Sequence, residues 1–112
     1  MVMFFKQVAV IGTILTGLYA LAAPRALRGF TGLEMPGGRG VTEVRAILGG
    51  LFIALGAAAL VFQSGEMFRM LGIAYLGIFA ARLLGMLLDS SYEKSNYISL
   101  AVEIVFGIAL VL

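Results

Sequence analysis

Five charged residues interrupt the long apolar runs of this sequence and could do chemistry there. Glu43 and Arg45 stand in one run, Arg82 and Asp89 in the next, and Glu103 in the last. A charge at the centre of a bilayer costs about 2.5 to 3.5 kcal/mol, so charged residues in such runs need partners or a function. Carboxylates beside an arginine can form an ion pair, bind a small anion or head group, or relay protons.

The residue inventory excludes most enzyme classes. The chain has no Cys and no His, which removes a thiolate nucleophile, an imidazole base and the usual zinc ligands. We therefore expect no catalytic residues, no metal site and no cofactor. The eight Lys and Arg residues are scattered and form no run of five, so a nucleic-acid partner is not expected.

The composition places these charges in a membrane protein. Of 112 residues, 62% are hydrophobic and 12% charged, and the mean hydropathy is +1.07. Soluble domains are about a quarter charged. Because one span needs about 20 apolar residues, the chain has room for four spans and no extramembrane domain. We predict one all-α transmembrane domain over residues 1–112, an antiparallel up-down four-helix bundle embedded in the lipid bilayer.

Local signals set the boundaries of the expected spans. Pro24 ends the first span, because the residue before a proline is pushed out of helical geometry. Ser90 and Glu93 fit a capping box, which predicts that the last helix begins at Ser91. The predicted spans cover approximately residues 2–23, 41–62, 67–88 and 91–112.

The long connection 24–40 has two different halves. Its first half, with Arg25 and Arg28, fits a short interfacial helix whose arginines face the polar side. Its second half, Met35 to Gly40, is rich in glycine and predicts a turn that is not regular helix. Counting Lys and Arg in the connections predicts that 24–40 and 89–96 are cytoplasmic in a protein of the inner membrane.

Small residues four apart indicate where helices pack, because association in lipid depends on close backbone approach. One such stripe lies in the second span and another in the third. The predicted packing residues are Ala46, Gly50, Ala54, Ala58, Gly77, Ala81 and Gly85. These stripes fit the interior of one bundle, and a contact to another subunit is the alternative.

The depths of Arg82 and Glu103 below the ends of their spans predict an ion pair between them. Arg82 lies seven residues, or about 10 Å, from Asp89, and Glu103 lies six residues, or about 9 Å, from Tyr97. The two residues therefore reach similar depth on consecutive antiparallel helices. Tyr75, seven residues before Arg82, shares its helix face.

Helix phase extends this pair to a larger predicted site. Glu43 falls within about 20° of Gly50 around its helix and therefore faces inward, whereas Arg45 is about 200° away and snorkels to the interface. The predicted intramembrane polar site consists of Glu43, Arg82 and Glu103, surrounded by Arg45, Asp89, Tyr75 and Tyr19.

Two segments and one later residue carry a resemblance to a known family. They are Thr42 to Gly50, Ala81 to Asp89, and Glu103. With them, and over nearly its whole length, the sequence resembles a family of small bacterial four-span membrane proteins catalogued as a domain of unknown function.

The family pattern has Glu-x-Arg before a double glycine, Gly-Arg with a later Asp-Gly, and a Glu in the fourth helix. This chain departs from it with Ala81 and Ser90 at the positions of the two other glycines. The resemblance names no activity, but it implies that five charged residues form one group: Glu43, Arg45, Arg82, Asp89 and Glu103.

The functional expectation follows from small size and missing catalytic residue types. We predict a small non-enzymatic integral membrane protein, an accessory or scaffolding subunit packed against larger membrane proteins or in a homo-oligomer. The alternative is a lipid or small-molecule binding or transport protein that uses the intramembrane Glu/Arg site. A third interpretation of that site is purely structural, as a salt bridge that sets helix register.

Overall fold

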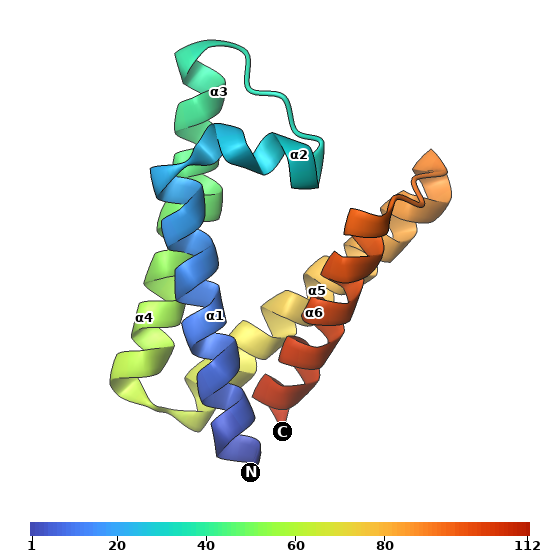
Figure 1. Ribbon diagram of the computed structural model, residues 1–112. Coiled ribbons are helices and arrows are strands. Elements are labelled where there is room, and N and C mark those ends of the chain that lie inside the picture. Colours follow the sequence, from blue (N-terminus) through green and yellow to red (C-terminus); the bar gives the residue numbers. More distant parts are fainter. The chain divides into compact units, whose positions relative to one another are not determined.

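The computed structural model describes residues 1–112 and is all-helical, as predicted. Four helical stretches are long and apolar enough to cross a membrane: Val2–Ala22, Gly37–Phe62, Gly65–Asp89 and Lys94–Val111. In chain order the elements are α1 (Val2–Ala22), η1 (Pro24–Leu27), α2 (Arg28–Thr31), α3 (Gly37–Val44), the π-helical η2 (Arg45–Leu51), α4 (Phe52–Phe62), α5 (Gly65–Asp89) and α6 (Lys94–Val111) (Figure 1).

The chain divides into two compact units, which are described separately. One comprises residues 10–61 and is called the α1–α4 unit. The other comprises residues 1–9 and 62–112 and is called the α5–α6 unit.

Glycines bring α1 and α4 into close contact in the α1–α4 unit. A Cβ on Gly17 would lie 2.8 Å from the carbonyl oxygen of Gly49, and a Cβ on Gly56 would lie 3.2 Å from that of Val10. Early α1 residues therefore meet late α4 residues, so the two helices run antiparallel. Side chains larger than hydrogen at Gly17 and Gly56 would push the backbones apart.

The packing stripe predicted for this helix does not include the two glycines that contact α1. Gly49 and Gly56 face α1, whereas a Cβ on Gly50 would meet only the carbonyl oxygen of Arg45, at 3.9 Å. The physical reason is η2, whose wider π-helical turn shifts the phase of the residues around it. The prediction of a stripe at Ala46, Gly50, Ala54 and Ala58 assumed a continuous α-helix.

The glycine-rich half of the connection is helical, which corrects the expectation of a turn over Met35 to Gly40. Pro36 is extended, with ψ of 120°, and α3 begins directly after it at Gly37, whose φ is 71°. A helix continues cheaply once it has formed, so the long apolar helix extends back through these glycines. Gly40 also needs its small size, because a Cβ there would lie 3.2 Å from the Cα of Met35.

The first half of the connection is helical, as predicted, in η1 and α2. Pro24 stands at the first position of η1, where its missing N–H costs nothing. Gly32 ends α2 with a left-handed φ of 73° and donates its N–H to the carbonyl oxygen of Arg28.

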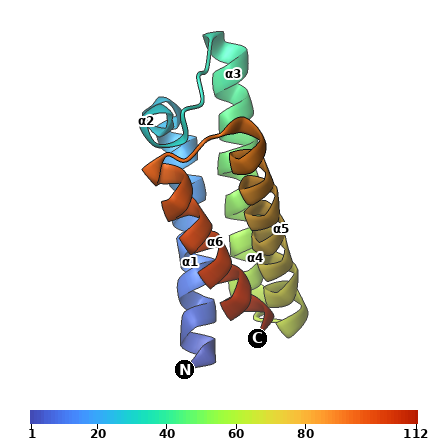
Figure 2. The ribbon, with the colours of Figure 1, turned by 90° about the vertical axis from the view of Figure 1, so that its right-hand side faces the viewer.

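The α5–α6 unit is built on an antiparallel helix hairpin, in which α5 and α6 lie side by side (Figures 1 and 2). Gly72 faces Gly107, and a Cβ on Gly72 would lie 2.9 Å from the carbonyl oxygen of Gly107. Tyr75 contacts Phe106 edge to face, with ring centroids 5.5 Å apart. Residue numbers rise along α5 as they fall along α6, which sets the register of the hairpin.

The start of α6 differs from the prediction. The helix begins at Lys94, with Glu93 as its N-cap residue and no side-chain cap, and not at Ser91. The hydroxyl of Ser91 donates to the Glu93 carboxylate and accepts from the Asn96 amide, so it caps no helix N–H. Ser90 has left-handed backbone geometry, with φ of 51°, and ends α5. The chain must reverse direction after it, so the next helix begins only at Lys94.

The first residues of α1 complete the α5–α6 unit. Gln7 and Gln63 exchange hydrogen bonds through their side-chain amides. Lys6 is 8% exposed, and its Nζ lies 5.6 Å from the centroid of the Phe68 ring. The negative face of the ring stabilises the ammonium group, which explains how a lysine is buried at this end of α1.

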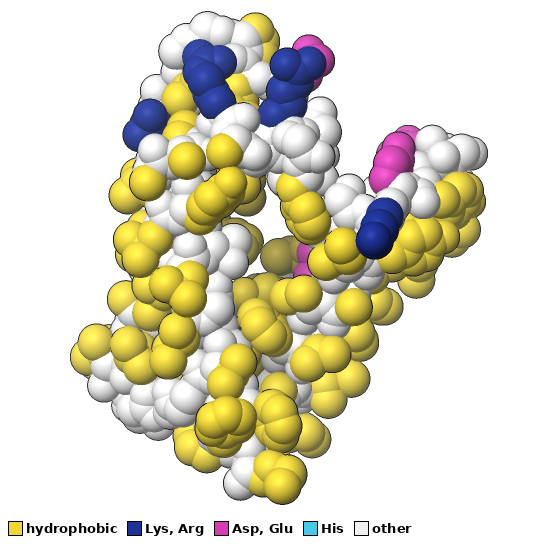
Figure 3. All heavy atoms as spheres, in the orientation of Figure 1, with side chains coloured by type: hydrophobic (Ala, Val, Ile, Leu, Met, Phe, Trp, Pro, Cys, Tyr) yellow, Lys and Arg dark blue, Asp and Glu magenta, His cyan; other side chains and the backbone are white.

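Large apolar side chains cover the flanks of both units. Val61, Met70, Ile73, Leu84 and Leu88 are each more than half exposed. Figure 3 shows yellow side chains along the helices, dark blue Lys and Arg side chains mainly around α2 and α3, and another dark blue side chain on the α5–α6 unit. Such a surface is suited to lipid or to other membrane proteins.

Candidate functional site

The ion pair expected between Arg82 and Glu103 is present and joins α5 to α6. The Nε of Arg82 donates to both carboxylate oxygens of Glu103 at 3.0 Å, and its Nη2 lies 2.9 Å from Oε2. The Glu103 side chain is 8% exposed and that of Arg82 is 32% exposed. The pair is therefore largely buried and charge-assisted, the geometry in which such contacts are strongest.

Asn96 is a third member of this site that sequence analysis missed. Its Oδ1 accepts a hydrogen bond from Nη1 of Arg82 at 3.0 Å, and its amide nitrogen donates to the hydroxyl of Ser91 at 2.9 Å. A chain of hydrogen bonds thus runs from the buried Glu103 through Arg82, Asn96 and Ser91 to Glu93 in the exposed turn. The available signal was spacing, because Asn96 lies seven residues before Glu103 and shares its helix face.

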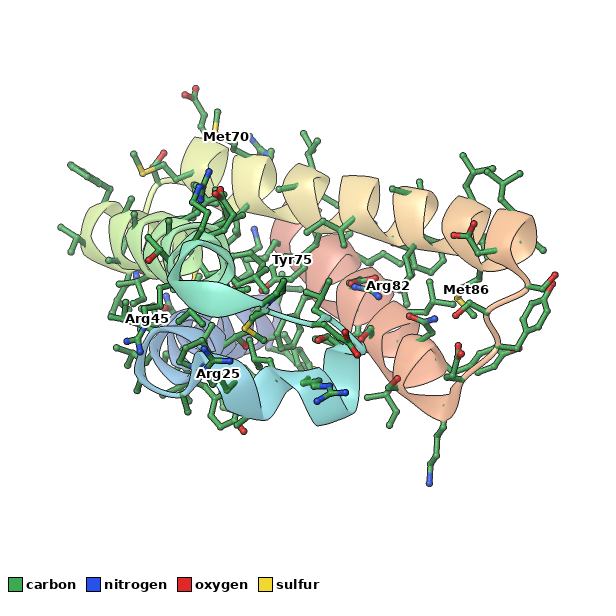
Figure 4. All side chains as sticks on the ribbon, turned by 90° about the horizontal axis from the view of Figure 1, so that it is seen from above. Arg25, Arg45, Met70, Tyr75, Arg82 and Met86 are labelled. Carbon is green, nitrogen blue, oxygen red and sulfur yellow. The ribbon has the colours of Figure 1, made fainter.

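Packing between α5 and α6 holds Arg82 in place. Tyr75 and Met86 are buried on either side of it along α5, and Figure 4 shows all three side chains on the side of α5 that faces α6. Tyr75 thus shares the face predicted for it. Asp89, which was predicted beside the site, is the exposed last residue of α5.

Glu43 belongs to the α1–α4 unit, where it has an ion-pair partner that the sequence analysis did not predict. It forms an ion pair with Arg39, and its side chain is 52% exposed. The reason is helix length. The stretch Gly37–Phe62 begins before the predicted span, and its 26 residues extend about 39 Å, longer than a hydrocarbon core of about 30 Å. Glu43 therefore lies near the end of the helix, where a neighbouring arginine one turn away is available.

Arg45, which was expected to snorkel to the interface, has an exposed side chain that binds the end of α1. Its Nη1 donates to the carbonyl oxygen of Leu21, at 2.8 Å, in the last turn of α1. The last carbonyls of a helix lack partners within it and carry partial negative charge, so an arginine there satisfies one and stabilises the helix end. Arg45 therefore lies beside the end of α1, which Arg25 follows by three residues.

The remaining predicted residue, Tyr19, lines a groove in the α1–α4 unit with Thr16 and Phe30. The structure therefore brings Arg82 and Glu103 together and adds Asn96. Glu43, Arg45 and Tyr19 belong to the other unit, each with neighbours of its own.

The geometry of the Arg82 site defines what it can do chemically. Nε and Nη2 of Arg82 face the two oxygens of Glu103, and the third nitrogen of the guanidinium, Nη1, donates to Asn96. No side-chain polar atom buried in the structure lacks a partner. The arrangement therefore compensates its own charges and ties two helices together.

The turn at the end of this network has a titratable group, Glu93. The hydrogen bond from the Ser91 hydroxyl, and next a bond from the backbone N–H of Glu93, lower the pKa of this carboxyl below its usual range. The hydrogen-bonded carboxylate stabilises the turn. This contribution is complete above the ordinary glutamate pKa of about 4.3 and is lost as the pH falls through the lowered pKa of Glu93.

We expect Ser91→Ala to raise the pKa of Glu93, measured by NMR titration of its side chain in detergent micelles. An unchanged pKa in this variant would contradict the assignment.

Four apolar helices and an internally compensated ion pair define the chain as a small multi-pass membrane protein. Residues 2–112 match the family described as "Domain of unknown function (DUF4345)", and the chain belongs to that family. No curated protein and no solved structure shows a significant match to the chain. The family resemblance seen in the sequence is therefore confirmed.

Proposed function

We propose that the protein is a non-enzymatic accessory or scaffolding subunit that packs against larger membrane proteins. The observation that carries this proposal is the stripe of small residues on α5, Gly77, Ala81 and Gly85. A Cβ added at Gly77 would meet nothing within 4 Å, and one at Gly85 would meet only the Asp89 carboxylate, at 3.8 Å. The α5–α6 hairpin instead uses Gly72 and Gly107 for its own contact.

Small residues four apart are what a partner helix needs for close approach in lipid. The α5–α6 hairpin leaves this stripe unused, which supports a helix–helix contact with a larger membrane protein. The large apolar side chains Met70, Leu84 and Leu88, each more than half exposed on α5, support the same role.

The proposal includes an orientation in the bacterial inner membrane. The connection between α1 and α4 has Arg25, Arg28 and Arg39, and the start of α6 has Lys94. Lys6 and Arg69 are the basic residues near the opposite ends of the spans. The excess favours the connections 24–40 and 89–96 on the cytoplasmic side.

A binding or transport function at Arg82 and Glu103 is the alternative. The partial exposure of Arg82, 32% of its side chain, favours it. Its guanidinium is already engaged by Glu103 and Asn96, however, so an anionic ligand would have to displace a partner. For this reason we rank the accessory role first.

Extraction in a mild detergent or in native nanodiscs tests the accessory role, with native gels and mass spectrometry as the measurement. We expect a complex containing a larger membrane protein, and we expect Gly77→Leu to dissociate it by filling the stripe. Ala101→Leu, at an exposed small residue of α6, is the matched control and should leave the complex intact. A species that migrates only at its own or its homo-oligomer size, with no co-purifying protein, would count strongly against the proposal.

A further inference from the structure

The segment that follows α1 has a cavity on each of two faces, and both cavities lie within the α1–α4 unit. One has a volume of about 320 Å³ and is called the polar cavity because three of its five lining residues are charged: Arg25, Arg28 and Glu34, with Met35 and Pro36. The other is an apolar groove of about 480 Å³, lined by Leu15, Thr16, Tyr19, Ala26, Leu27 and Phe30.

Helical spacing separates these two sets of side chains. Arg25 and Arg28 are three residues apart and share one face of the η1–α2 segment. Leu27 and Phe30 are also three apart and share another face. The segment is therefore amphipathic over its few turns, with basic groups and apolar groups separated by one helix diameter of about 10 Å.

The polar cavity presents incompletely compensated positive charge. Nη1 of Arg25 donates to the carbonyl oxygen of Met35 at 3.3 Å, and this neutral acceptor leaves the charge in place. A guanidinium has five N–H donors, so further donors of Arg25 remain for a ligand. Arg28 pairs with Glu34 at 3.1 Å, but both side chains are at least two-thirds exposed. Exposed pairs of this kind contribute only about 0 to 1 kcal/mol, so an anion can replace Glu34 at Arg28.

The groove on the other face is suited to a hydrocarbon chain. The hydroxyl of Thr16 donates to the carbonyl oxygen of Gly12, at 2.8 Å, so this polar group is already satisfied. Phe30 remains 45% exposed and Leu15 59% exposed, which leaves apolar surface for a ligand to cover. Tyr19 has the amphipathic ring that is enriched where a membrane meets water.

The position of the segment along the chain sets its depth. α1 has 21 residues, which extend about 31 Å and match a hydrocarbon core of about 30 Å. Arg25 follows the end of α1 by three residues and therefore lies at the depth of the lipid head groups. The Leu15 to Tyr19 side of the groove lies on the last two turns of α1, at the depth of the upper acyl chains.

We propose that the η1–α2 segment binds an anionic phospholipid, with its phosphate at Arg25 and Arg28 and an acyl chain in the groove beneath. Such a molecule would place its head group in the polar cavity and its acyl chain in the apolar groove. A lipid is about as long as one leaflet is thick, about 20 Å, and can therefore reach across the helix diameter that separates the two. Arginine is the residue best suited to phosphate, because its planar fork donates two parallel hydrogen bonds. A free phosphate ion would use only the polar cavity. The proposal is independent of the accessory role.

Lipid binding to the full chain is measured by native mass spectrometry, with phosphatidylglycerol, phosphatidylcholine and inorganic phosphate as three separate probes. We expect phosphatidylglycerol to be retained preferentially and inorganic phosphate to be unable to displace it. Arg25→Gln should lower the affinity for phosphatidylglycerol by about tenfold, as expected for loss of charge-assisted hydrogen bonds. Phe30→Ser should lower it as well, because it removes apolar surface from the groove.

Two further variants separate a site from a general effect of charge or folding. Arg69→Gln makes the same change in net charge on α5 and should leave the affinity unchanged. Glu34→Gln releases Arg28 and should raise the affinity about two- to fivefold, a gain that a misfolded protein would not give. Equal losses in Arg25→Gln and Arg69→Gln, equal retention of the two lipids, or displacement by inorganic phosphate would overturn the proposal.

Discussion

Glu103→Ala should be among the most destabilising single substitutions in this chain, lowering the free energy of unfolding by about 3 kcal/mol. The substitution removes the carboxylate that pairs with Nε and Nη2 of Arg82 and leaves the guanidinium without its charged partner. The expected loss is at the low end for buried pairs, because Arg82 is one-third exposed and keeps its hydrogen bond to Asn96. Thermal unfolding in detergent, followed by circular dichroism, measures the effect.

The double variant Glu103→Ala with Arg82→Ala is the matched control for this prediction. Removing both charges removes the penalty for burying an unpaired one, so we expect the double variant to be more stable than Glu103→Ala alone. Losses that simply add, or that are equal in the two proteins, would show that the contact between the residues contributes nothing.

Gly72→Ala should separate α5 from α6 and cost roughly 1 to 3 kcal/mol. A Cβ at this position would lie 2.9 Å from the carbonyl oxygen of Gly107 and 2.9 Å from the Cβ of Leu110. The carbonyl is part of a helix backbone and cannot move aside as a flexible side chain would. The hairpin must therefore shift as a whole, and the Arg82–Glu103 pair would shift with it.

Gly77→Ala is the control on the same helix. A Cβ there would meet nothing within 4 Å, and alanine is the better helix former by about 0.5 to 1 kcal/mol. We expect this variant to unfold at the same temperature as the original protein or slightly higher. Similar destabilisation by both substitutions would mean that Gly72 does not make the close contact described.

Several features of the fold could be predicted because they depend on local physics alone. Apolar runs of about 20 residues define membrane spans, and observed helices such as α1 and α5 begin and end within two residues of their predicted limits. The Arg82–Glu103 pair could be predicted as well. A fixed rise per residue sets the depth of each side chain on consecutive helices, and two opposite charges at equal depth have a strong reason to meet.

Helix rotation could not be predicted in the same way. Every span has several small residues, so α5 offers Gly72 as well as the stripe at Gly77, Ala81 and Gly85. Which of them meets α6 depends on the sum of all contacts along the hairpin, including Leu76 against Gly107 and Tyr75 against Phe106. The π-helical turn at Arg45–Leu51 likewise has no sequence signal of its own, yet it shifts the packing face to Gly49.

The candidate site likewise has residues that could be predicted from the sequence and residues that could not. Arg82 and Glu103 follow from charge and depth, but Asn96 stands near the start of α6 and resembles an ordinary polar residue of a helix end. Its contact with Arg82 arises because α6 begins at Lys94 and turns this side chain toward α5. The ion pair of Glu43 with Arg39 was not predicted, because it depends on α3 beginning earlier than the apolar pattern does.

The sequence by itself determined that this is a small helical membrane protein, where its spans lie, and which two buried charges must compensate each other. Those properties follow from composition, length and the cost of a charge in lipid, which depend on no particular arrangement of helices. Only the tertiary structure decided which glycines meet, which groups complete the ion pair, and how the arginines of the connection form a cavity above an apolar groove. Each of these depends on rotation about a helix axis or on the start of a helix, and only packing between helices fixes them.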